Sequence, residues 1–348
     1  MLYVVLVFLV VSFFLYVLLG GADFGAGIVE LFSSKINQKP IKKTVYEVMG
    51  PVWEANHIWI IIMIVILWIG FPMTYNIVVV YLHIPLTLVL LGITLRGAAF
   101  IFRHYDAIKS DNSQKRYDVL FRISCLITPV FLGMTFGALV AGDIRLLEDN
   151  PGLGFYDAYL HPWLQAFPIL IGCFYATLCT FLAAVFLIGE ASDEERLMYI
   201  RKGKVAIIAV VIVGFLVVIT GCLEGRTFIL DFIKSPYAVC SVLVSAILLY
   251  PLWRAIRFGR IKRCRIFAGL QVALILFAAA ITHFPNVIAT TSGDLNFMDD
   301  LAPESVMRVL GSSLLVGGAL IIPGFLHLLK SFHLDKMRGK PNEGPLTH

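Results

Sequence analysis

Residues 50–61 read "GPVWEANHIWII" and place three polar side chains in an otherwise apolar run. Glu54, Asn56 and His57 lie between Trp53 and Trp59. A carboxylate can bind and release a proton, and an imidazole titrates near neutrality, so these residue types suit a proton relay. Glu54 and His57 are three residues apart, which predicts that they share one face of a helix.

Two further ionisable residues lie near the ends of apolar runs. Asp23 lies in "GGADFGAG", just past the first run, and Arg96 lies in "LRGAAFIFR", near the end of the third. Glycines such as Gly25 allow neighbouring backbones to approach closely. Ionisable groups within a membrane are costly and usually face the bundle interior or a wet cavity. We therefore expect Asp23, Glu54 and Arg96 to form one functional cluster near the cytoplasmic face.

The same residues also have a plainer interpretation. Acids and bases at helix ends can touch lipid headgroups or cap helices. Tryptophans such as Trp53 and Trp59 are common in the aromatic belt at the membrane interface. His57 can also be an ordinary hydrogen-bonded histidine.

The composition determines which elements carry these residues. The chain of 348 residues is 59% hydrophobic and only 15% charged, against about 25% charged in ordinary soluble proteins. Its mean hydropathy is +0.86. Apolar stretches long enough to cross a bilayer lie near residues 2–20, 52–71, 77–102, 118–141, 162–188, 203–222, 236–254, 265–284 and 305–329. They lack the alternation of barrel strands, so the sequence predicts an all-α polytopic membrane protein with about nine transmembrane helices.

The chain is predicted to form a single integral-membrane domain over residues 1–348. The first stretch begins at Met1 without a basic segment or a clear cleavage site, so we interpret it as a retained span and not as a signal peptide. No polar segment is long enough for a second, soluble domain.

Basic residues predict the orientation, because Lys and Arg in short loops stay on the cytoplasmic side. One set of loops and the C-terminal tail carries 22 of them, whereas the opposite loops carry only Arg145, Arg226 and Lys234. The N-terminus is therefore expected outside and the C-terminus in the cytoplasm. The net charge of +5 reflects this topology and gives no indication of nucleic-acid binding.

Cysteines and histidines give little sign of a metal or haem site in this chain. The six cysteines form no C-x-x-C pair and are expected to behave as small apolar residues. Cys222 and Cys240 are the one pair that could form a disulfide on the outer side. The eight histidines lie mostly at helix ends or in loops, and no pair at mid-span is available to ligate a haem.

Five stretches of this sequence resemble subunit II of cytochrome bd-type quinol oxidases. They are "GGADFGAGI", "GPVWEANHIWI", "GFPMTYN", "LRGAAFIFR" and "FPNVIATTSGDLNFMDD", in the order and spacing of that family. The resemblance implies a subunit of a complex in the bacterial cytoplasmic (inner) membrane that oxidises quinol and reduces dioxygen to water. It implies that haem b and haem d lie in the partner subunit I, and that this chain binds no haem.

The resemblance also implies an arrangement of the spans and a role for the cluster. The fold would be two four-helix bundles, over residues 1–142 and 161–285, plus a peripheral helix over residues 305–330. Asp23, Glu54 and Arg96 match residues of the family's proton route from the cytoplasm. Two positions depart from the family pattern: Gly20 replaces an acid of the first segment, and Ile101 replaces an acid of the third. His57 could bridge the gap at Ile101 together with Glu54.

Two alternatives and several details stay open at this point. A secondary transporter would also contain broken helices and buried ionisable residues, and a purely structural subunit would use Asp23 and Glu54 only for assembly. The sequence does not distinguish ubiquinol from menaquinol. The partners that the resemblance implies are subunit I, membrane lipid and quinol. The sequence does not decide whether a structural quinone or a small single-span subunit also binds.

Overall fold

The computed structural model describes residues 1–50, 53–105, 110–191, 193–258 and 260–338. Within that part of the chain, nine helices are long and apolar enough to cross a membrane, which confirms the predicted fold class. They are Leu2–Leu31, Trp53–Gly70, His83–His104, Asn112–Ala141, Ala166–Leu187, Glu195–Leu223, Pro236–Arg257, Ile261–His283 and Glu304–Leu328. Val52, where the second span was predicted to begin, and the basic residues Lys109 and Lys340 lie outside the described residues.

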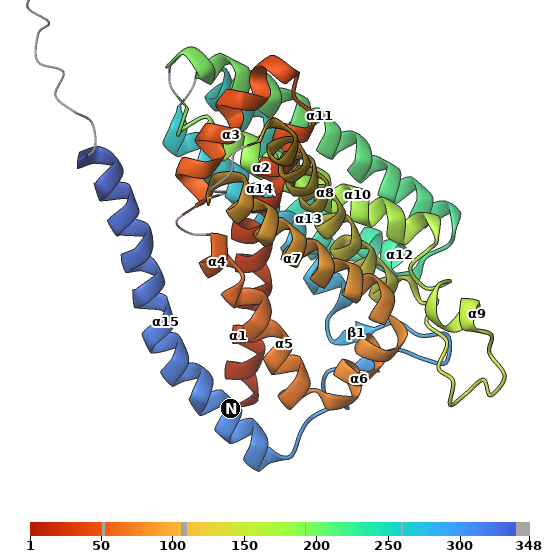
Figure 1. Ribbon diagram of the computed structural model, residues 1–348. Coiled ribbons are helices and arrows are strands. Elements are labelled where there is room, and N and C mark those ends of the chain that lie inside the picture. The colour runs from red at the N-terminus through yellow and green to blue at the C-terminus, as the bar shows by residue number, and fades with distance from the viewer. Residues whose placement is uncertain (51–52, 106–109, 192, 259, 339–348) are drawn as a thin grey trace, which may run out of the picture.

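The elements follow one another along the chain as a nearly all-helical series (Figure 1). Their bounds are α1 Leu2–Leu15, η1 Tyr16–Gly20, α2 Gly21–Leu31, α3 Lys35–Met49, α4 Trp53–Asn56, α5 Ile58–Gly70, α6 Pro72–Tyr81, α7 His83–Tyr105, α8 Asp111–Ala141, α9 Phe155–Tyr159, α10 Ala166–Leu187, α11 Asp193–Leu223, α12 Thr227–Lys234, α13 Pro236–Arg257, α14 Ile261–His283, β1 Asn286–Ile288, β2 Leu295–Asn296 and α15 Glu304–Arg338.

The first span is longer than its apolar stretch. The prediction ended it near residue 20 and put Asp23 beyond it, but α1 continues through the π-helical turn η1 into α2. The prediction was wrong because the glycine-rich segment, although weakly apolar, is buried against α10 and α8. Asp23 is therefore a residue within the span. It lies about 32 Å along the helix from Leu2, at a rise of about 1.5 Å per residue.

The second span is interrupted at its polar end. α4 is a single turn, and His57 separates it from α5. α5 ends at Gly70, after which Phe71 leaves the helical conformation and Pro72 begins α6. Proline at the first position of a helix is favourable because its missing N–H would have no partner there. The third span begins at His83 and not near residue 77 as predicted, because residues 72–81 form this separate helix α6.

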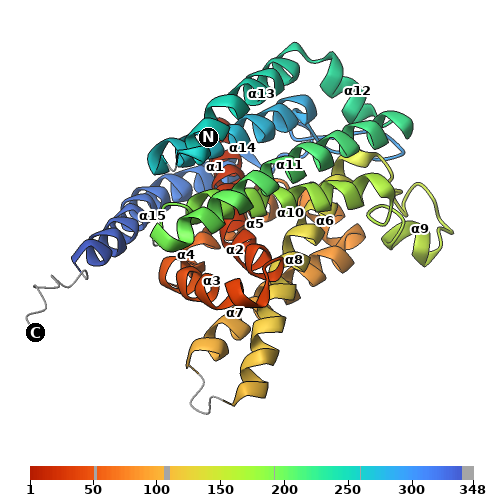
Figure 2. The ribbon, with the colours of Figure 1, turned by 90° about the horizontal axis from the view of Figure 1, so that it is seen from above.

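α10 is the central helix of the packing. It contacts α2, α8, α11 and α14, and α7 packs along α8. α1 packs against α5 and α15, and α15 runs along one edge of the molecule (Figure 1). α3 lies across one end of the bundle, as the view from above shows (Figure 2). The division into two four-helix bundles stays a prediction.

The end opposite α3 is closed by short connections. β1 and β2 pair in an antiparallel ladder. Asp300, which follows them, accepts hydrogen bonds from the backbone N–H groups of Met73 (3.0 Å) and Thr74 (2.6 Å) in the first turn of α6. Cys222 and Cys240 are both free and exposed, so the disulfide considered above is not formed.

Candidate functional site

Asp23 is the acid buried most deeply among the residues predicted for the site. α2 carries it into the interior, where it is 3% exposed. The side-chain amide of Asn56, itself 4% exposed, donates a hydrogen bond of 2.6 Å from Nδ2 to Asp23 Oδ2. The short helix α4 therefore presents Asn56 to α2.

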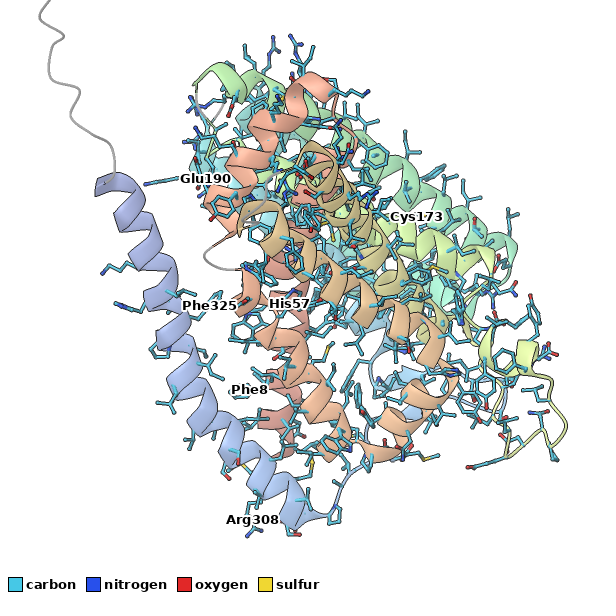
Figure 3. The ribbon with its side chains drawn as sticks, in the orientation of Figure 1. Phe8, His57, Cys173, Glu190, Arg308 and Phe325 are labelled. Atoms are coloured by element: carbon cyan, nitrogen blue, oxygen red, sulfur yellow. The ribbon has the colours of Figure 1, made fainter. Side chains whose placement is uncertain are left out.

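Arg96 reaches the same region from α7 and contacts His57. Arg96 is 2% exposed, and its Nη1 donates to His57 Nε2 over 3.3 Å. Because a guanidinium only donates, Nε2 is the acceptor and a neutral ring carries its hydrogen on Nδ1. His57 lies at the junction of α4 and α5, where Figure 3 labels it. We call Asp23, Asn56, His57 and Arg96 the Asp23 cluster.

Aromatic rings surround the cation of this cluster. The guanidinium carbon of Arg96 lies 4.8 Å from the centre of the Phe24 ring and 6.0 Å from that of Trp53. The ring centroids of His57 and Phe24 are 5.9 Å apart. Cation–π contacts of this kind stabilise a charge that has been withdrawn from water. They explain how Arg96 can be buried at the end of a membrane span.

Glu54 does not join the Asp23 cluster. Its side chain is exposed on the surface of this chain. The Glu54 carboxylate makes no hydrogen bond or ion pair with the described residues. Glu54 and Asn56 are two residues apart on one helical turn, so they point about 200° apart at about 100° per residue. Glu54 and His57 nevertheless have different surroundings, because Glu54 is exposed whereas the His57 ring contacts Arg96.

The supporting residues of the two motifs are packing residues. A Cβ atom on Gly25 would lie 1.8 Å from the carbonyl oxygen of Cys179, so only glycine allows α2 to pack this closely on α10. Trp59 is 4% exposed and lies 5.8 Å from the Phe325 ring of α15. Trp53 packs over Gly97, where a Cβ atom would meet its ring at 3.1 Å. Both tryptophans therefore pack against other helices of this chain.

Sequence reasoning missed a second buried charged group. Glu30 and Arg103 form an ion pair of 3.0 Å with side chains only 2% and 0% exposed. Arg103 Nε also lies 3.4 Å from Asp118, and Lys42 binds the same carboxylate at 2.6 Å. Glu30 follows Asp23 by seven residues, so both lie on one face of α2. That spacing was the available signal, whereas Arg103 lies just past the third apolar stretch and has no comparable signal in the sequence.

The described residues offer no evident place for a metal ion. Within residues 1–50, 53–105, 110–191, 193–258 and 260–338, no three His, Cys, Asp or Glu side chains are close enough together to hold one. The arrangement instead suits proton handling: a buried carboxylate, a donor-only cation and an imidazole lie at one end of a helical bundle.

Comparisons with known proteins agree with this description. The model of the family described as cytochrome bd terminal oxidase subunit II matches residues 1–332. The chain is 27% identical over 214 residues to cytochrome bd ubiquinol oxidase subunit 2 of Bacillus subtilis, an alignment that covers 60% of this chain and 59% of the relative's length. It is 21% identical over 319 residues to cytochrome bd-I ubiquinol oxidase subunit 2 of Escherichia coli K12, with 83% of each chain covered.

A solved structure supports the fold. The bd oxidase from Geobacillus thermodenitrificans contains a chain that superposes with a TM-score of 0.74 at 17% identity. The match covers 95% of this chain and 98% of that one. At this identity the likeness concerns the fold alone.

Proposed function

The chain belongs to the family of cytochrome bd terminal oxidase subunit II, and from this premise we propose that it lines a proton route in a complex that oxidises quinol and reduces dioxygen. Membership in an oxidase subunit family leaves the transporter alternative without support. We propose further that haem b and haem d lie in subunit I, where they would supply the reduction of dioxygen. This chain would contribute the proton-handling side chains.

The observation that carries the proposal is the environment of Asp23. Its carboxylate is withdrawn from water, and one oxygen is held by the Asn56 amide at 2.6 Å. Buried ionisable groups in membrane spans are costly and mark proton relays in many membrane proteins. Asn56 orients the carboxylate without titrating, so Asp23 is the group of this pair that can take up and release a proton.

Glu54 has a different part in the proposed route. It lies on the exposed face of α4, directly opposite the face that carries Asn56. An acid on the outer surface of an apolar helical subunit suits a contact with another subunit, because a lipid environment would disfavour its charge. We assign Glu54 to the interface with subunit I, where it would exchange protons with that subunit. α4 then links the interior acid with the interface acid.

Arg96 and His57 set the charge and the geometry between these two acids. The guanidinium would stabilise the ionised carboxylate after it has released its proton. His57 accepts from Arg96 through Nε2 and so orients it. Ile101, where the family pattern has an acid, cannot carry a proton, so the route must pass through Asp23 or Glu54 instead.

The proposed orientation places this end of the bundle at the cytoplasm. α3, which lies across that end, and the loops near it hold most of the basic residues. Protons would therefore be taken from the cytoplasmic side. The N-terminus would lie outside, in a multi-pass protein of the bacterial inner membrane.

The test uses substitutions that keep shape and remove titration. Asp23→Asn retains an oxygen that can accept from Asn56, and Glu54→Gln retains the length of the side chain. The whole complex is purified, its haem content is measured, and oxygen reduction with quinol is followed. We expect normal haem content with turnover reduced by about 100-fold or more, the usual contribution of an acid–base group.

Glu47→Gln is the matched control, since Glu47 is an exposed acid on α3. It should leave turnover unchanged. If Asp23→Asn and Glu54→Gln complexes assemble with full haem content and turn over like the control, the two acids are structural and the proton role is wrong.

A further inference from the structure

A line of buried residues runs from Asp23 back along the first span. Ser12, Tyr16, Gly20 and Asp23 are spaced by four, four and three residues, so they lie on one face of the continuous helix. Ser12 is 0% exposed, Tyr16 is 1% exposed and Gly20 is also buried. The line covers about 16 Å at about 1.5 Å per residue. Ser12 then lies about 15 Å from Leu2, half the thickness of a bilayer core of about 30 Å.

Both hydroxyl groups on this line lack a hydrogen-bond partner among the described residues. Several other hydroxyl groups on the membrane-spanning helices do have a partner. Ser124, Thr128 and Thr135 of α8 each donate a hydrogen bond to the carbonyl four residues earlier, whereas the Ser12 hydroxyl does not. Buried polar atoms nearly always have a partner, and an unpartnered one points to an ordered water molecule or to a functional role.

Other unpartnered polar atoms surround Tyr16. Its ring lies 6.0 Å from the His57 ring, centroid to centroid, and it packs in one buried cluster with Phe24 and Trp59. In the part of the chain that is described, His57 Nδ1, Trp59 Nε1 and Arg96 Nε are buried and have no partner either. Five polar side chains therefore share one interior region with unused hydrogen-bonding atoms.

The backbone of the first span is irregular at the same place. η1 is a π-helical turn that begins at Tyr16 itself. Single π turns within α-helices occur frequently at functional sites. A Cβ atom on Gly20 would lie 3.1 Å from the Tyr16 ring, so the glycine makes the room in which the phenol ring lies.

From these observations we infer that Tyr16 and Ser12, with ordered water molecules between them, continue the proton route from Asp23 to the middle of the membrane. The inference rests on the function proposed above and extends it. Buried water typically makes about three hydrogen bonds to polar groups that would otherwise be unsatisfied. The five side chains offer donors and acceptors of that kind around Tyr16.

The transfer leaves each hydroxyl group and each water molecule on the line unchanged. Asp23 gives its proton to an adjacent water molecule, which passes one of its own hydrogens to the Tyr16 oxygen, and the hydroxyl hydrogen of Tyr16 leaves for the next water. That water protonates the Ser12 oxygen, and the Ser12 hydroxyl hydrogen leaves for a water molecule beyond Ser12, which carries the proton onward. Asp23 remains as a carboxylate, which a proton from the cytoplasmic side neutralises before the next transfer. Tyr16 and Ser12 relay the proton that Asp23 releases, and we call them relay residues and not catalytic ones.

Tyr16→Phe in the whole complex tests the inference, with Tyr199→Phe as the control. Tyr199 is a fully buried tyrosine on α11 whose hydroxyl is also unpartnered among the described residues. The measurements are haem content, oxygen reduction, and the ratio of rates in H₂O and D₂O. We expect normal haem content, a rate of oxygen reduction about tenfold below the control and a larger ratio of the rates in H₂O and D₂O. The expected loss of rate is smaller than the loss of a direct acid–base group would cause. A structural defect alone would not raise that ratio.

Asp23→Asn, measured in parallel, separates the two proposals. If Asp23→Asn is slow and Tyr16→Phe matches the control, the extended route is wrong and the proposed function stands. If Asp23→Asn itself retains the full rate, the proposed function fails and this inference fails with it. Should Tyr16→Phe not assemble, Ser12→Ala replaces it under the same criteria, because it removes only one oxygen atom.

Discussion

The buried ion pair between Glu30 and Arg103 allows a stability prediction with a built-in control. Arg103→Met removes the cation and leaves the Glu30 carboxylate, 2% exposed, without its 3.0 Å partner. Breaking a buried pair in this way typically costs about 3–5 kcal/mol. Arg308→Met removes the cation of the pair Glu304–Arg308, whose side chains are 88% and 71% exposed. Exposed pairs four residues apart on a helix contribute only about 0.3–0.5 kcal/mol.

The assay is thermal unfolding of the purified complex, followed by the loss of its monodisperse, haem-containing peak. If each kcal/mol lowers the midpoint by about 2 °C, Arg103→Met should lower it by about 6–10 °C and Arg308→Met by about 1 °C. The double variant Glu30→Leu with Arg103→Met should recover most of the loss, because replacing a whole buried pair by apolar residues is often neutral. Equal midpoints for Arg103→Met and Arg308→Met would refute the reasoning that burial decides the strength of these pairs.

The remaining predictions concern helix packing, haem and topology. Gly25→Ala must move α2 away from α10 by about 1.6 Å, so that the added Cβ lies 3.4 Å and not 1.8 Å from the Cys179 carbonyl oxygen. This overpacking costs about 1–3 kcal/mol, so the yield of purified complex should fall. Gly269→Ala is the control and should leave the yield unchanged, because a Cβ atom there would meet no atom within 4 Å. His57→Phe should leave the haem content of the complex unchanged in its absorption spectrum, and a lost haem band would show that this chain supplies a ligand. Reporter fusions after Lys43 should report cytoplasm and those after Pro151 the outside, and the reverse pattern would put the Asp23 cluster at the wrong face for proton uptake.

The sequence by itself determined the class of protein, the number of spans and the regions that matter. Hydropathy acts on each segment separately, since any run of about 20 apolar residues favours the bilayer whatever its neighbours are. The segments around Asp23, Asn56 and Arg96 could be identified for the same reason: a polar group in an apolar run is conspicuous in one dimension. The family resemblance was correct, and so was the count of nine apolar helices for the residues that the structure describes.

Only the tertiary structure decided which polar side chains meet. Contacts between spans depend on how each helix is rotated and where it is interrupted, and packing against neighbours sets both. The orientation of α4 turns Asn56 towards Asp23 and leaves Glu54 exposed, although the three polar residues of the motif are almost adjacent in sequence. Glu30 and Arg103 are 73 residues apart and pair because α2 and α7 bring them together. No one-dimensional pattern contains that pairing, because it arises from the mutual orientation of two helices.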